Sequence, residues 1–125
     1  MNQTQLPFLV EGILIVATML VGFGLSRSGR PYGKVKLGIH LFLALWFSTG
    51  YGFIAYSLGA HHPAAIVWVP VFVMGLAILA QLGTGFAMLA ADSAGRTLLK
   101  LHIVASVLLL VADAAAFVLT GLPAH

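Results

Sequence analysis

Four long apolar stretches follow one another along the chain and are separated by short polar segments. They cover about residues 8–25, 37–58, 64–90 and 98–119. A helix needs about 20 apolar residues to cross the hydrocarbon core of a bilayer, because each residue adds about 1.5 Å of length. The pattern therefore predicts an all-α membrane protein with four transmembrane helices, the third of which contains Pro70 and is expected to kink there.

Composition supports a membrane location for the whole chain. Of the 125 residues, 61% are hydrophobic and only 7% are charged, which is more apolar side chain than a soluble domain of this size can bury. We therefore expect residues 1–125 to form one integral-membrane domain. The absence of cysteine excludes disulfides and thiolate metal sites. No positive charge precedes the first apolar stretch, so we expect that stretch to be a retained helix and not a cleaved signal peptide.

The cations predict the orientation in the membrane. All six lie in the segments that join the first helix to the second and the third to the fourth: Arg27, Arg30, Lys34, Lys36, Arg96 and Lys100. The positive-inside rule places both segments in the cytoplasm and both termini outside, as in a bacterial or archaeal inner membrane. These cations are better explained as topology signals than as a nucleic-acid surface, since no nucleic-acid-binding motif is present.

A weak internal repeat relates the two halves of the chain. At one constant offset, three features of the first half recur in the second, namely Gly33-Lys34 with Gly95-Arg96, Leu37 with Leu99, and His40 with His102. Short connections favour antiparallel neighbours, so we expect an up-down-up-down bundle built from two similar helical hairpins.

His40 and His102 each lie about one turn inside the basic end of a helix. In an up-down-up-down bundle the second and fourth helices are parallel, so the two imidazoles are expected at one depth and able to face each other. An ionisable side chain inside a membrane helix suggests a functional site. The alternative is that each neutral histidine only hydrogen bonds to a Ser or Thr across the bundle. Two opposed imidazoles are what a b-type haem needs as axial ligands.

Glycines and cations near the histidines fit the same hypothesis. Glycines without a Cβ leave room for a flat macrocycle, and four lie near this depth on the first and third helices: Gly22, Gly24, Gly83 and Gly85. Close packing of helices needs the same residue type. Four cations lie within reach of haem propionates: Lys34, Lys36, Arg96 and Lys100. Lipid phosphates are the alternative partner for these cations.

With histidines on helices two and four and glycines on helices one and three, the chain resembles the four-helix core of membrane-bound b-type cytochromes. Such cores often hold a second haem about four turns further along, but those positions here are near Ile54 and Ala116, which cannot ligate iron. The resemblance implies one haem b near the cytoplasmic face, with His40 and His102 as its ligands. It also implies a carrier of single electrons and not a stand-alone enzyme. Membrane lipid, a quinone, and a larger redox complex or further copies of the chain are its expected partners.

Two acidic side chains interrupt the apolar stretches in the other half of the bundle. Glu11 and Asp113 each lie about 14 residues, or about 21 Å, from the basic end, with Tyr51 at nearly the same height. A carboxyl group there has to be protonated, paired or hydrated. Three interpretations remain open: the two share a proton and join the helices, they accept protons from a quinol, or they bind a metal with His61 or His62.

Other functions also fit the sequence. A cofactor-free accessory subunit would use its apolar surface to pack in a larger complex. A protein that binds a chlorophyll-type pigment would use the same imidazoles as magnesium ligands. A small transporter would use Glu11 and Asp113, but no charged residue continues such a path through the basic half.

Overall fold

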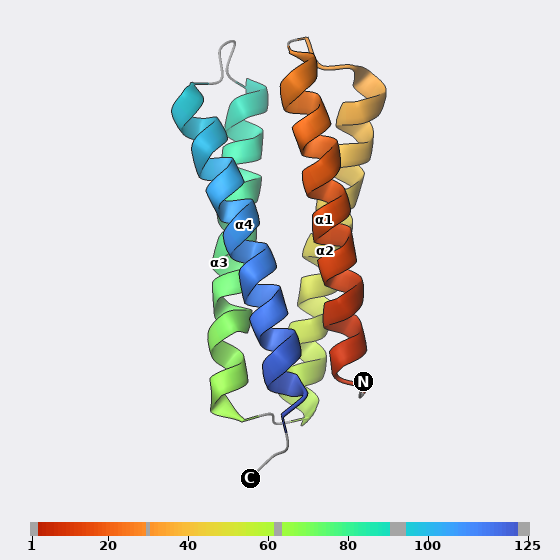
Figure 1. Ribbon diagram of the computed structural model, residues 1–125, viewed down its shortest axis with the longest axis vertical. Coiled ribbons are helices and arrows are strands. Elements are labelled where there is room, and N and C mark those ends of the chain that lie inside the picture. Colours follow the sequence, from red (N-terminus) through yellow and green to blue (C-terminus); the bar gives the residue numbers. More distant parts are fainter. Residues whose placement is uncertain (1–2, 30, 62–63, 91–94, 123–125) are drawn as a thin grey trace.

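The computed structural model describes residues 3–29, 31–61, 64–90 and 95–122, and it confirms the predicted all-α bundle. Four helices run alternately up and down (Figure 1): α1 (Gln5–Ser28), α2 (Lys34–His61), α3 (Ala65–Ala90) and α4 (Arg96–Thr120). Each is long and apolar enough to cross a membrane. No strand occurs in the part of the chain that the structure describes.

The helices extend slightly beyond the apolar stretches and include polar residues near their ends. At the end of α1 the Ser26 hydroxyl donates to Phe23 O at 2.8 Å, and the Ser28 hydroxyl donates to Gly24 O at 3.1 Å. The second helix continues through His61, which the sequence had placed in the connection. Pro70 lies inside α3, as expected.

The bundle consists of two helical hairpins, α1 with α2 and α3 with α4. Close contact between α1 and α4 joins the hairpins, whereas α2 and α3 approach each other at only a few points. Helices α2 and α4 lie diagonally across the bundle without backbone contact. We call the end with the turn from α1 to α2 the basic end, and the opposite end, where Figure 1 marks N and C, the terminal end.

Apolar side chains fill the centre of the bundle and also cover its outside. The buried core is centred on residues such as Phe8, Ile15, Phe47, Met74 and Leu109. Large apolar side chains are exposed on all four helices, which is the surface that contact with lipid requires. The buried polar side chains within the described ranges are Glu11, Thr18, Gln81, Ser106 and Asp113.

Candidate functional site

The structure brings His40 and His102 together across the diagonal of the bundle. Their ring centroids are 6.2 Å apart, and the ring planes are inclined by 56°. Both rings are half-buried, and they come from α2 and α4, whose backbones do not touch. The prediction that the two imidazoles face each other at one depth is consistent with this distance.

The hydrogen bond of His40 determines which ring nitrogen carries the proton. His40 Nδ1 lies 3.1 Å from the backbone oxygen of Thr18 on α1. A carbonyl oxygen only accepts hydrogen bonds, so Nδ1 of a neutral His40 must be the donor. The lone pair of the ring is then on Nε2. Metal-binding histidines usually have this arrangement, in which the other ring nitrogen donates to a carbonyl or carboxylate.

His102 is hydrogen bonded to α3 through the same ring nitrogen. Its Nδ1 lies 2.9 Å from the hydroxyl oxygen of Thr84. That hydroxyl also lies 2.7 Å from Ala80 O, and when it donates its proton there it accepts from His102 Nδ1. Each hairpin therefore supplies one histidine and, on its preceding helix, the group that orients it.

Two of the four predicted glycines lie directly against the histidine rings. A Cβ on Gly22 would be 2.9 Å from Cε1 of His40, and a Cβ on Gly85 would be 3.5 Å from Cε1 of His102. A Cβ on Gly24 or Gly83 would meet no atom within 4 Å. Gly22 thus makes room for the His40 imidazole itself, which the sequence alone did not indicate, whereas a Cβ at Gly85 would make an ordinary van der Waals contact with His102.

Two further hydrogen bonds connect the backbone oxygen of His102 with the side chains of Ser106 and Gln81. The Ser106 hydroxyl donates to His102 O at 2.8 Å, and the side-chain amide of Gln81 donates to that same hydroxyl oxygen. The structure thus identifies the Thr84 hydroxyl and the Thr18 carbonyl as the hydrogen-bond partners of the two histidine rings.

The four predicted cations are all exposed and lie at the basic end: Lys34, Lys36, Arg96 and Lys100. Lys36 precedes His40 by one helical turn and therefore shares its side of α2. Lys100 is two positions from His102, so it lies on nearly the opposite side of α4.

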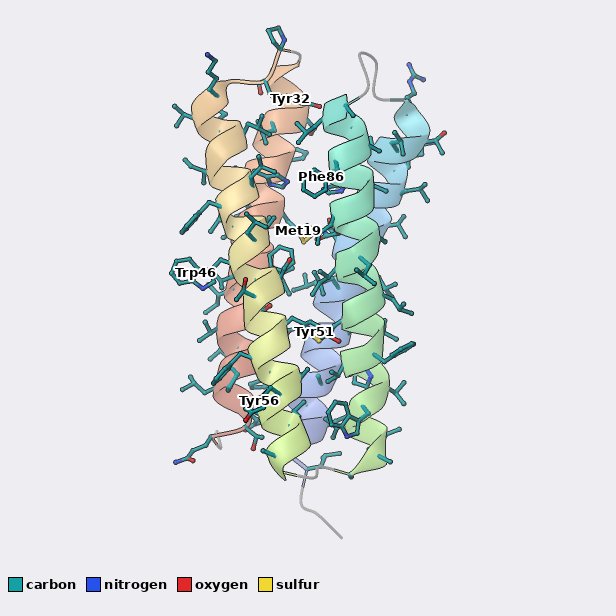
Figure 2. The ribbon with its side chains drawn as sticks, turned by 180° about the vertical axis from the view of Figure 1, so that it is seen from behind. Met19, Tyr32, Trp46, Tyr51, Tyr56 and Phe86 are labelled. Carbon is teal, nitrogen blue, oxygen red and sulfur yellow. The ribbon has the colours of Figure 1, made fainter. Side chains whose placement is uncertain are left out.

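Figure 2 shows how the larger side chains lie relative to the space between the hairpins. Met19 and Tyr51 point into that space, whereas Trp46 points away from the bundle. Trp46 packs edge-to-face on Phe42 at 5.4 Å between ring centroids, and both are exposed. Met19 had no predicted role, because nothing in the sequence distinguishes it from other apolar residues of α1.

The predicted acidic layer is only partly assembled. Glu11 and Asp113 are almost fully buried on the neighbouring helices α1 and α4, and the two groups interact electrostatically. The Tyr51 hydroxyl instead donates to Val71 O on α3 at 3.1 Å. The backbone of Tyr51 lies near Glu11, whereas its phenol is hydrogen bonded to α3.

Among the side chains that the structure describes, no group of three or more His, Asp or Glu is arranged to hold a metal ion. The predicted metal site of the two acids with His61 or His62 involves side chains outside that described set. No protein-family model, curated protein or solved structure matches the chain.

Proposed function

We propose that this protein is a membrane b-type cytochrome that carries single electrons through one haem b, with His40 and His102 as axial ligands. The observation that carries the proposal is that both histidines have Nδ1 hydrogen bonded to the preceding helix, which leaves Nε2 of each for a metal. Two histidines from different helices, each held through Nδ1, have the arrangement that suits a ligand pair.

The spacing of the rings fits a shared metal. Two imidazole nitrogens at about 2.0 Å from one metal ion place the ring centroids about 6 Å apart. The observed separation is 6.2 Å. Because a bare ion would need at least one more protein ligand, two histidines alone favour a metal that brings its other donors with it. A porphyrin supplies four.

The residues of the chain would then have separate tasks. His40 and His102 would hold the haem iron, and Thr18 O and Thr84 keep their rings in place. Gly22 leaves room for the His40 ring, and the apolar helices exclude water. Lys36, which shares its side of α2 with His40, would be the cation best placed for a propionate, with Lys34, Arg96 and Lys100 at the same end of the bundle. When bound, the haem supplies one-electron redox chemistry without an open iron position for O₂.

The proposed orientation places the basic end in the cytoplasm and both termini outside, by the positive-inside rule. The haem then lies near the cytoplasmic face of a bacterial or archaeal inner membrane. A quinol or a larger redox complex is the proposed electron donor. The exposed apolar faces, above all on α2, leave room for lipid, a complex subunit or a second copy of the chain.

A chlorophyll-type pigment is the second candidate, because the same Nε2 lone pairs ligate magnesium. A cofactor-free accessory subunit is the third, and the exposed surface of α2 favours it. An absorption spectrum separates all three.

The test is a reduced-minus-oxidised spectrum of the full-length protein purified from haem-replete membranes, compared with His40→Ala and His102→Ala. We expect a b-type spectrum that both variants lose or strongly weaken. His61→Ala, at the far end of α2, is the matched control and should keep it. A magnesium-type pigment spectrum would support the second candidate, and colourless protein would support the third.

A further inference from the structure

Glu11 and Asp113 are the most deeply buried ionisable side chains in the described part of the chain. Glu11 is 3% exposed and Asp113 is 4% exposed. One oxygen of each, Glu11 Oε1 and Asp113 Oδ1, is buried without a hydrogen-bond partner. Buried polar atoms normally have a partner, and a proton on the carboxyl group is one way to satisfy such an oxygen.

Two glycines make room for these carboxyl groups. A Cβ on Gly50 of α2 would lie 2.5 Å from Glu11 Oε2, and a Cβ on Gly12 of α1 would lie 2.7 Å from Asp113 Oδ2. No real Cβ contact is that short, so any larger residue would displace the acids. The bundle therefore holds each carboxyl in a fitted space, as Gly22 does for His40.

The neighbouring helices provide no cation to neutralise the pair. Helix α3 contains no titratable residue, and the cations of the chain lie about 21 Å away at the basic end. On α2 the nearest titratable group is Tyr51, whose hydroxyl is bonded to Val71 O. On α1 and α4 the facing groups are the two acids themselves. Burying two interacting negative charges in an apolar bundle is costly, so a proton on at least one of the carboxyl groups stabilises the pair.

A pocket lies at the terminal end of the bundle between α1 and α2. It has a volume of about 330 Å³. Its lining includes Gln3, Thr4, Phe8, Ile54, Ser57 and Leu58. Phe8 precedes Glu11 by three residues on α1, and Ile54 follows Gly50 by four on α2, so these two lining residues are about one helical turn from Glu11 and from Gly50.

We propose that Glu11 and Asp113 form a buried site that binds one exchangeable proton, which reaches it from water at the terminal end through this pocket. The step is the transfer of a proton from water to a carboxylate oxygen, and no electron takes part. The proposal does not depend on haem, because it uses only the two acids, their glycines and the pocket.

Infrared difference spectra of the full-length protein in lipid, recorded between acid and alkaline pH, test the site. We expect a protonated-carboxyl C=O band that titrates, shifts in D₂O, and is lost in Glu11→Gln and in Asp113→Asn. Either variant is sufficient if the other does not fold. Asp92→Asn, which removes the only other acidic side chain, is the control and should keep the band. A band that neither titrates nor exchanges, or that survives both variants, would overturn the proposal.

The rate of exchange into D₂O tests the route. Ser57→Leu adds bulk to the pocket and should slow exchange of the carboxyl band several-fold. Thr49→Leu places the same side chain on an exposed part of α2 and should leave the rate unchanged. Equal rates in the two variants would exclude this pocket as the route. Colourless protein would affect neither measurement, so the failure of this proposal and of the proposed haem are distinguishable.

Discussion

The ring of His40 lies so close to Gly22 that a single added methyl group would be 2.9 Å from its Cε1 atom. A glycine of one helix and a histidine of the next thus fit together as one unit. The second hairpin repeats this unit less tightly, with Gly85 and His102. The relationship makes the histidine site sensitive to changes on helices that contribute no ligand.

Gly22→Ala should weaken haem binding about tenfold, because the new methyl group pushes His40 away from Thr18 O and from the metal. Gly24→Ala is the matched control, since a Cβ there meets no atom within 4 Å. The measurement is haem retained per chain during titration with a competing haem-binding protein. Equal haem retention in the two variants would show that haem binding does not depend on the position of the His40 ring.

Thr84→Val should lower haem affinity about 10- to 100-fold, because His102 Nδ1 loses its hydrogen-bond partner and the ring is no longer held in place. Thr84→Ser keeps the hydroxyl and should restore affinity. Thr18→Val is a second control, since His40 bonds to the backbone oxygen of that residue and not to its side chain. The same titration measures all three, and a Thr84→Val protein that binds like wild type would contradict the assignment.

Gly50→Ala should destabilise the bundle by about 1–3 kcal/mol, because its Cβ would collide with the Glu11 carboxyl. Gly52→Ala, two residues along α2, meets no atom within 4 Å and should be neutral or slightly stabilising. Denaturant unfolding in detergent, followed by circular dichroism, measures the difference. If both variants unfold alike, the space around Glu11 is not tightly fitted.

The midpoint potential of the haem should fall as pH rises through the titration of Glu11 and Asp113. Loss of the proton leaves a negative charge about 15 Å from the histidine layer, and that charge opposes the arrival of an electron. At an effective dielectric constant of about 20 the effect is about 1 kcal/mol, or about 45 mV. Redox titrations over a range of pH measure it.

The double variant Glu11→Gln/Asp113→Asn should have a higher potential at alkaline pH and should lose this part of the pH dependence. Asp92→Asn serves as the control that keeps both acids of the pair. A pH dependence unchanged in the double variant would place the responsible group elsewhere.

The length and apolar character of the four stretches, with their short connections, were sufficient to predict the four helices and their alternating directions, because few other folds accommodate so much apolar side chain. The shared depth of His40 and His102 followed from the same topology. The helix ends were less predictable, since polar residues such as Ser26 and Ser28 still belong to α1.

The detailed contacts of the site depend on rotation of each helix about its axis, which the sequence pattern defines poorly. Four glycines had been grouped together, yet only Gly22 and Gly85 face a histidine ring. Tyr51 had been grouped with the acids by height, but its phenol points to α3. The acceptor for His40 is a backbone atom, so no side chain in the sequence indicates it.

The most direct test of the central claim is the number of haem groups per chain, measured by pyridine haemochrome analysis of purified protein with and without His102. We predict one haem b per chain in the wild type and almost none in His102→Ala. Wild-type protein without haem, or an unchanged ratio in His102→Ala, would contradict the assignment of His40 and His102 as ligands of one iron.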